Sequence, residues 1–300
     1  SIMIKSMTGY GKSQREMDGR VFQVEVRSIN SKTLDLNLKL PSEFRELEPL
    51  FRARIAAVMQ RGKVECVFSV QQLADAAQAA AYHINTAQVE RYWEDFHALT
   101  TNLLMKKWSG SLPEPAIVFT LPGVVVEDKE EVPTEAFKDS ILGTLDQALA
   151  LADASRQQEG EVLAKDFRMR VELIEDLLAQ VEPFEQQRVP NIRQKMEKQL
   201  ADLNLPVEID RNRLEQEMIY YLEKLDITEE KVRLRKHCRY FKDTMDAEAA
   251  PGRKLGFIAQ EMGREINTLG SKANEADIQK LVVRMKDELE KIKEQLANIL

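Results

Sequence analysis

The sequence lacks the motifs that mark several large classes of enzyme. Its two cysteines, Cys66 and Cys238, lie far apart and show no C-x-x-C spacing, so neither a disulfide framework nor a zinc ribbon is indicated. It contains no P-loop, no dinucleotide-binding glycine motif, no G-x-S-x-G turn and no H-E-x-x-H pair. The nucleotide-binding, serine-hydrolase and zinc-protease chemistries that depend on those motifs are therefore not expected.

Apolar runs and aromatic residues are also scarce. No stretch of 18 or more apolar residues is present, and the first residues lack the basic-then-apolar order of a signal peptide. We therefore expect a cytoplasmic protein without membrane contact. Aromatic residues make up 6% of the chain, which does not favour a base-stacking platform.

The chain also has few helix breakers and no excess of positive charge. Only 10 Pro and 12 Gly occur in 300 residues, so helix should dominate. The formal net charge is -7, which argues against a uniformly basic protein that coats nucleic acid. Any site for RNA must therefore be local.

Period-two alternation of apolar and polar residues predicts strands in the first third of the chain. The clearest runs are 20 to 28 and 34 to 40, and Pro41 ends the second of them. Helices are expected at about 42 to 58 and at about 86 to 107. The fold class predicted is α+β: an N-terminal antiparallel sheet with helices, then long helical arms and a mostly α-helical C-terminal domain.

The helical arms are predicted from a long stretch with few breakers at about 134 to 187. Val189-Pro190 and Leu205-Pro206 are expected to interrupt the helix that follows, and Gly270 to end a later one. The domains predicted are an α+β domain at 3–155, a helical arm at 156–208 and a helical domain at 209–300 that carries the site.

One line of charged residues near the start of the last domain could support phosphodiester chemistry. Carboxylates can hold a divalent ion or take a proton, arginine can stabilise phosphate charge, and histidine can transfer a proton near neutral pH. A solvated helix face with Glu–Arg pairs is the competing interpretation. The line consists of Asp226, Glu229, Glu230, Arg233 and His237, most of them at helical spacings of three and four.

A second charged cluster follows on a later predicted helix. Glu261 and Glu265 are one turn apart and could bind Mg²⁺ or Mn²⁺ through oxygen, with Arg264 beside them. A polar helix surface is again the alternative. The cluster also contains Arg253, Lys254 and Lys272.

Basic and amide side chains lie on predicted turns of the sheet as well. Arg27, Asn30 and Lys32 lie between two strands, and Arg61 and Lys63 precede another. Such groups can bind phosphates, and they can equally serve as turn or surface residues.

Spaced motifs over nearly the whole chain resemble the YicC family. In the first half they are Met7-Thr8-Gly9-Tyr10-Gly11, Val24 to Asn30, and Arg61-Gly62-Lys63-Val64-Glu65. In the second half they are Arg213 to Glu217, Asp226, Glu229-Glu230, Arg233-Leu234, His237, Gly252 to Leu255, Phe257, Gln260-Glu261, Arg264-Glu265, Asn267-Thr268 and Gly270-Ser271-Lys272. Two positions depart from the family pattern: Gly256 stands where Asp is common, and Gly263 where Asn is common.

This resemblance implies a metal-dependent endoribonuclease that cleaves single-stranded or hairpin RNA, takes part in RNA turnover and assembles as a homo-hexamer. The implied cofactor is Mn²⁺ or Mg²⁺. The resemblance implies catalytic roles for His237, Glu261, Glu265 and Arg264, and metal ligation by Asp226, Glu229, Glu230, Glu261 and Glu265. It implies phosphate contacts for Arg233, Arg253 and Arg264. Together with the basic and amide residues of the turns and the second cluster, the residues predicted to bind RNA are Arg27, Asn30, Lys32, Arg61, Lys63, Arg233, Arg253, Lys254 and Lys272.

Two points stay open at this stage. The attacking nucleophile could be a metal-bound water or the RNA 2′-hydroxyl. Two other functions also fit the residues: a non-catalytic RNA-binding adaptor that delivers RNA or another nuclease, and a structural oligomeric stress protein whose charged helices form subunit contacts.

Overall fold

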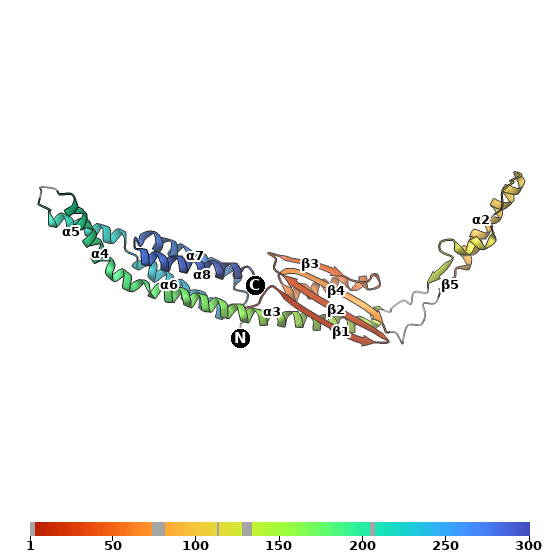
Figure 1. The fold of residues 1–300 in the computed structure, drawn as a ribbon. Coiled ribbons are helices and arrows are strands. Elements are labelled where there is room, and N and C mark those ends of the chain that lie inside the picture. The colour runs from red at the N-terminus through yellow and green to blue at the C-terminus, as the bar shows by residue number, and fades with distance from the viewer. Residues whose placement is uncertain (1–3, 74–81, 113, 128–133, 205–207) are drawn as a thin grey trace.

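The computed structural model describes residues 4–73, 82–112, 114–127, 134–204 and 208–300. A four-stranded sheet lies in the middle of the molecule, with a bundle of helices on one side and a small helical appendage on the other (Figure 1). The fold is α+β, as predicted. Among the described residues, no helix combines enough length with enough apolar character to cross a bilayer.

The sheet forms where the sequence alternates. In β2, Phe22, Val24 and Val26 are completely buried, while the residues between them face outward. The strand order is β1-β2-β4-β3, with antiparallel pairs between β1 and β2 and between β2 and β4. The strands are β1 (Gly9–Met17), β2 (Arg20–Ile29), β3 (Leu34–Lys39) and β4 (Gly62–Gln72).

The pairing of β3 differs from the predicted antiparallel sheet. β3 pairs with β4 in parallel, so the sheet is mixed. The connection between them contains the short helix η1 (Ser42–Leu47) and the helix α1 (Glu48–Met59). A helical crossover returns the chain to the same end of the sheet, and this makes its two strands parallel.

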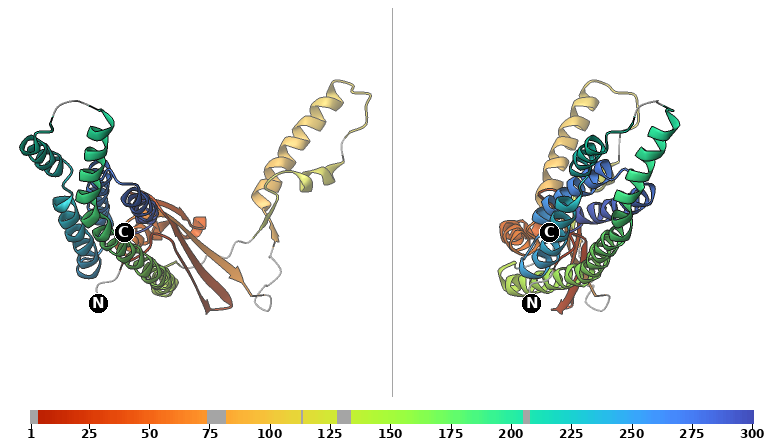
Figure 2. Two further views of the ribbon diagram at one scale, coloured as in Figure 1. Left: turned by 60° about the vertical axis from the view of Figure 1, so that its left-hand side comes forward. Right: turned by 90° about the vertical axis from the view of Figure 1, so that its left-hand side faces the viewer.

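The longest helix, α3 (Thr134–Ala179), joins the sheet to the helical bundle. It has 46 residues and spans roughly 70 Å at ~1.5 Å per residue. Its first part packs on the sheet through Ile141, Leu145 and Ala148, and a later part packs in the bundle through residues such as Phe167. Figure 1 shows this single helix running along the sheet and on along the bundle, and the turned views in Figure 2 show the same continuous course.

Close packing of β1 against α3 explains a glycine of the N-terminal motif. A side chain at Gly11 would collide with the backbone carbonyl of Ala148, and one at Gly160 of α3 would collide with the carbonyl of Ile4. Only glycine allows the backbones to approach this closely.

The bundle consists of the second part of α3 and the helices that follow it. Buried residues from α3, α6, α7 and α8 form one apolar core, which includes Phe167, Leu234, Phe241, Met262, Ile266 and Met285. The helices after α3 are α4 (Val181–Asp202), α5 (Arg211–Lys224), α6 (Thr228–Ala247), α7 (Gly252–Lys272) and α8 (Ala276–Leu296).

Two predicted helix boundaries are wrong. Helix α4 continues through Pro190, which lies on its exposed side together with Gln186. Water can therefore hydrate the carbonyl that proline leaves without a partner. Helix α7 runs past Gly270 to Lys272, because the apolar contact of Leu269 with the core outweighs the low helix propensity of one glycine. The predicted break at Leu205-Pro206 lies outside the described residues.

The appendage contains one main helix and a two-stranded sheet. Helix α2 (Thr86–Met105) is capped by Asn85, whose side-chain oxygen accepts a hydrogen bond of 3.2 Å from the Gln88 backbone N–H. This helix matches the expected 86 to 107. Around it lie β5 (Tyr82–Ile84), η2 (Pro115–Thr120) and β6 (Val125–Glu127), and β5 and β6 pair antiparallel. This strand pair was not predicted.

Candidate active site on helices α6 and α7

Helices α6 and α7 run antiparallel and hold most of the predicted site residues. Leu234 and Phe241 of α6 and Met262 of α7 are completely buried in the bundle core. Because these apolar residues recur every three or four positions, each helix keeps a polar face outside the core. The two polar faces adjoin along the seam between the helices.

Side-chain pairs cross this seam at three levels. Lys272 Nζ lies 2.7 Å from Glu230 Oε1, and an Arg233 guanidinium nitrogen lies 4.0 Å from Glu265 Oε1. At the third level, Lys254 Nζ lies 5.1 Å from the ring centre of Tyr240. These pairs set the register of the two helices.

The register places His237 opposite the turn of α7 that contains Glu261. His237 follows Arg233 by four residues and precedes Tyr240 by three, so it lies between the second and third levels. It is half-buried, and among the described residues it has no hydrogen-bond or ion-pair partner. Its two ring nitrogens are therefore not engaged by any of these residues.

Two of the predicted carboxylates are buried and neutralised by cations. Glu230 is 4% exposed and pairs with Lys272, while Glu265 is 6% exposed and lies beside Arg233. The second carboxylate oxygen of Glu230 is buried without a hydrogen bond among the described residues. Buried polar atoms are seldom left in this state, so this oxygen can accept a further hydrogen bond.

Glu261 and Glu265 do not converge on one point. Glu261 pairs with Arg264 at 3.5 Å on the exposed side of α7, whereas Glu265 faces Arg233. The side chain of Arg264 is 67% exposed, so its guanidinium can reach a bound phosphate.

Asp226 and Glu229 have local partners at the start of α6. Asp226 accepts hydrogen bonds from the Thr228 backbone N–H at 3.1 Å and from its hydroxyl at 2.7 Å. These bonds lower the pKa of Asp226 below its usual value, the hydroxyl bond having the larger effect. Glu229 forms an ion pair with Arg233.

The predicted metal ligands do not form a cage within one chain. No group of three or more His, Cys, Asp or Glu side chains able to hold an ion occurs in the part of the chain that the structure describes. Mg²⁺ is commonly held by one or two carboxylates together with water and substrate phosphates. The side chain of Glu261 is 42% exposed and that of Glu229 is 65% exposed, so both carboxylates are accessible from solvent.

The basic turns of the sheet are partly structural. Asn30 donates a hydrogen bond to the carbonyl of Ala297, and Arg61 Nε donates to the carbonyl of Ser31 at 3.1 Å. Arg27 pairs with Glu25 at 2.6 Å. Lys32 and Lys63 are exposed, and neither has an ion-pair or hydrogen-bond partner within the described ranges.

The C-terminal residues bring these turns close to the start of α7. The Met7 N–H donates to Asn298 at 2.8 Å, the Leu300 N–H donates to Lys5 at 3.0 Å, and the Gly252 N–H donates to Leu300 at 2.8 Å. Arg253 and Lys254 follow immediately on α7. The basic turns of the sheet and the pair Arg253 and Lys254, all of them predicted to bind RNA, therefore lie at one junction between the sheet and the bundle.

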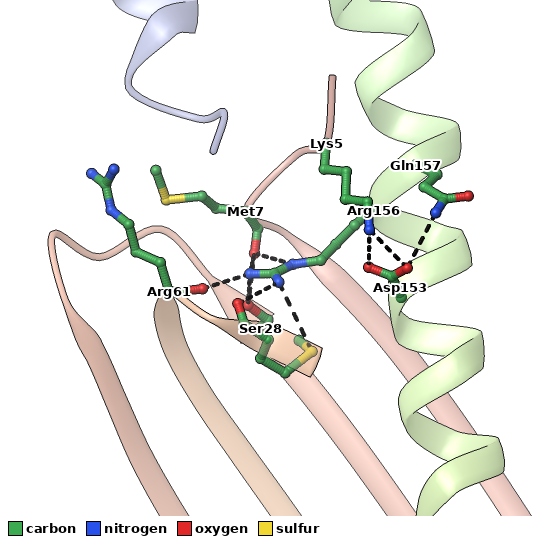
Figure 3. A network of polar contacts seen from close by, with 8 residues as sticks. Lys5, Met7, Ser28, Arg61, Asp153, Arg156 and Gln157 are labelled. Carbon is green, nitrogen blue, oxygen red and sulfur yellow. Dashed lines mark hydrogen bonds and ion pairs between the residues drawn. The ribbon is translucent and has the colours of Figure 1, made fainter. Parts of the chain in front are cut away.

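A buried arginine at this junction was not predicted. Arg156 of α3 is completely buried, and its guanidinium donates to the carbonyls of Met59 at 2.8 Å and Arg61 at 2.7 Å and to Ser28 Oγ at 3.1 Å (Figure 3). It also donates to the carbonyl of Met7. Burial lowers the pKa of Arg156. These bonds connect α3 to the residues before β1, to the end of β2 and to the residues before β4. The role of Arg156 is therefore structural.

Sequence reasoning also missed a basic run on α6. Arg235, Lys236 and Arg239 are exposed and form no ion pair or hydrogen bond with any described residue. The run from Arg233 to Arg239 is a local concentration of positive charge on an acidic chain. This basic run could have been predicted from the local density of charge in the sequence, which the net charge of the whole chain conceals.

Comparison with known proteins identifies the family of the chain. Residues 4–165 match the family model described as the N-terminal region of the YicC-like endoribonucleases, and residues 181–300 match the C-terminal one. A "probable endoribonuclease YicC" from Clostridioides difficile is 32% identical over 308 residues, covering 99% of this chain and 100% of the relative. A protein of the same description from Haemophilus influenzae is 30% identical over 303 residues, with the same coverage. The chain therefore belongs to the YicC-like endoribonuclease family.

Proposed function

We propose that this protein is an endoribonuclease that cleaves single-stranded or hairpin RNA and takes part in RNA turnover. The observation that carries the proposal is the position of His237. Its imidazole has no partner among the described residues and lies between two cross-helix contacts, on the side of α6 that faces α7. The two curated relatives are themselves named probable endoribonucleases.

Each side chain of the seam has a role that follows from its surroundings. His237 accepts or donates the proton that moves during phosphodiester cleavage. Arg264 is exposed and binds the phosphate, while Glu265 holds the Arg233 guanidinium at the seam. Both a water molecule and the 2′-hydroxyl are compatible with this geometry as nucleophile. A 2′-hydroxyl attack would leave a cyclic phosphate and would not cut at a deoxyribose, so analysis of the product ends distinguishes the two.

RNA binding is proposed to involve α6 and the junction with the sheet. Lys236 and Arg239 on α6, Arg253 on α7, and Lys32 and Lys63 on the sheet turns are all exposed. Because the chain as a whole is acidic, attraction should depend on this local surface and weaken steeply with salt. An RNA affinity that stays constant between low and moderate salt would contradict this part of the proposal.

The cofactor and the assembly are further parts of the proposal. A requirement for Mn²⁺ or Mg²⁺ follows from the family resemblance, and none of the roles given above passes through a metal ion. The number of six subunits follows from the family resemblance alone. Association of copies as such is supported by apolar side chains that one chain leaves exposed, among them Leu99 and Leu104 of α2 and Ile219 of α5. Mass measurement in solution tests the subunit number.

The main experiment is cleavage of a labelled RNA hairpin with Mn²⁺, Mg²⁺ or EDTA. His237→Ala should abolish most of the activity, because general acid–base groups commonly contribute about 10²- to 10⁴-fold. His97→Ala is the matched control, since this histidine lies on the appendage against Trp93. Both variants should keep the mass of the wild-type assembly.

The other outcomes separate the alternative functions. An RNA that is bound but not cut with any metal would support the adaptor and remove the catalytic roles. A Glu261→Ala variant that changes the assembly and leaves cleavage intact would support the structural protein. Full activity in EDTA would remove the metal requirement and leave the role of His237 in place.

A further inference from the structure

Two aromatic side chains are exposed at the end of the seam near the α6–α7 turn. Tyr240 of α6 is 46% exposed and Phe257 of α7 is 59% exposed. Exposed apolar residues are common on protein surfaces and need no explanation by themselves. The groups around these two rings set them apart.

A cation lies over each ring. Lys254 Nζ is 5.1 Å from the ring centre of Tyr240, and the guanidinium carbon of Arg253 is 5.9 Å from that of Phe257. Both distances lie within the range of cation–π attraction, ~6 Å. Lys254 belongs to α7 and Tyr240 to α6, so this contact brings the two rings to neighbouring positions on the helix pair. The exposed fractions show that much of each ring still faces solvent.

The rings are surrounded by polar side chains rather than by an apolar patch. On α7 the residues one or two turns from Phe257 on the exposed side are Arg253, Gln260 and Arg264. On α6, Lys236 lies one turn before Tyr240. An apolar protein partner would bury these cations without compensation. A nucleic-acid strand offers base faces to the rings and phosphates to the cations.

We propose that Tyr240 and Phe257 form a stacking platform for unpaired nucleobases of the RNA. The proposal rests on the function proposed above, because Tyr240 lies one helical turn from His237, and Phe257 one turn from Glu261. Bases stack on the two rings while Arg253 and Arg264 contact the adjacent phosphates, and Lys254 stays paired with Glu248 beside Tyr240. Because the faces of bases within a duplex are covered by the neighbouring base pairs, the platform favours single-stranded segments and holds them beside the reactive seam. Two rings suffice for this, so the low aromatic content of the chain is no obstacle.

The test uses substitutions that remove or preserve the ring in the full-length protein. Phe257→Leu and Tyr240→Leu keep apolar bulk without an aromatic face, whereas Phe257→Tyr and Tyr240→Phe keep the ring. Trp108→Leu is the control for removal of an exposed aromatic residue elsewhere, since Trp108 belongs to the appendage. The probe is a single-stranded RNA with one 2-aminopurine, mixed rapidly so that binding is measured before turnover.

The ring-removing variants should bind the probe roughly 5- to 150-fold more weakly for each base that no longer stacks. They should also lack the fluorescence quenching that stacked 2-aminopurine shows. The ring-preserving variants and Trp108→Leu should behave like the wild type. The same probe annealed to its complement should bind all variants alike.

Unchanged affinity and quenching in both leucine variants would overturn the platform, as would an altered assembly mass in those variants. Cleavage of the same RNA is measured in parallel. A wild-type protein that quenches the probe but does not cut would reject the nuclease function and leave the platform standing. If the wild-type protein cuts the RNA and the leucine variants bind the probe normally, the platform is rejected and the nuclease function stands.

Discussion

Helices α2 and α7 are almost equal in length but differ completely in how they are covered. α2 has 20 residues and none of them is buried, whereas α7 has 21 and eight of them are buried. Helix α7 packs against α6 and α8, while α2 contacts mainly the short helix η2. Apart from Phe257, the large apolar side chains of α7 are buried within the chain, whereas α2 presents its apolar side chains to solvent.

The difference separates two uses of an amphipathic helix. In α7, burial of Met262 and Ile266 fixes the helix in the core, so Glu261 and Arg264 on its outer face occupy defined positions. A site needs this kind of rigid support. In α2, side chains such as Leu104, which is 62% exposed, are free to bind another surface. This contrast fits the proposals made above, in which α7 takes part in the chemistry and α2 in the assembly.

The largest expected effect concerns thiol reactivity in the two regions. Burial raises the pKa of Cys238, which lies in the same core as α7, from 9.0 to about 12. At pH 8 the thiolate that reacts is therefore about a thousandfold scarcer than for an ordinary cysteine. A cysteine introduced as Ala98→Cys on the exposed side of α2 should therefore react with an aromatic disulfide reagent at least about a thousandfold faster than Cys238.

Cys66 supplies a second reference for the same experiment. It is buried in the sheet core, and burial raises its pKa to about 12 as well. Both native cysteines should react at the rate at which their own core opens. Rapid labelling of Cys238 in the native protein would show that the bundle around α7 is not a stable core.

The next effect is on stability. Ile266→Ala should lower the free energy of unfolding of the bundle by about 2–5 kcal/mol, because Ile266 is completely buried and its removal leaves a cavity. Leu99→Ala in α2 should cost less than about 0.5 kcal/mol, since Leu99 is exposed in the single chain. Urea unfolding at a protein concentration too low for association measures both. Similar decreases in the two variants would contradict the contrast between the helices.

The sequence alone predicted both helices and could not distinguish their surroundings. Residues 86 to 105 and 252 to 272 have helical spacing in either case, because periodicity reports an apolar face and not what covers it. The parallel pairing of β3 was missed for a related reason: strand alternation does not specify a neighbour, and the crossover through α1 decides it. Helix α4 continues through Pro190 because that residue is exposed, and exposure is a tertiary property.

Much of the candidate site was nevertheless predictable. Helical spacing placed Glu230, Arg233 and His237 on one face, and all three lie on the side of α6 that adjoins α7. The partners across the seam were not predictable, since Lys272 follows Glu230 by 42 residues and its contact depends on the packing of two helices. The same holds for the junction, where Asn30 bonds to the carbonyl of Ala297. Long-range contacts of this kind leave no local pattern in a single sequence.

A smaller effect is expected on assembly. Leu104→Lys places a charge on the apolar side of α2 and should weaken association of the copies by tenfold or more, because burying a leucine contributes about 1.5–3 kcal/mol. Ala98→Lys on the opposite side of the same helix is the control. Light scattering over a range of concentrations gives the mass of each variant. If Leu104→Lys keeps the wild-type mass at every concentration, α2 is not part of the subunit contact.

The smallest effect is expected on stability, when two glycines of α7 and one exposed alanine of α2 are substituted. A Cβ at Gly256 would meet nothing within 4 Å, so Gly256→Ala should stabilise the bundle by about 0.5–1 kcal/mol through helix propensity alone. A Cβ at Gly270 would lie 2.9 Å from Val282 Cγ1, so Gly270→Ala must displace a core side chain and should gain less or destabilise. Ala98→Gly in α2 should weaken only the appendage helix. Thermal unfolding followed by circular dichroism gives all three changes, and an equal gain at both glycines would mean that packing around α7 is looser than its buried face indicates.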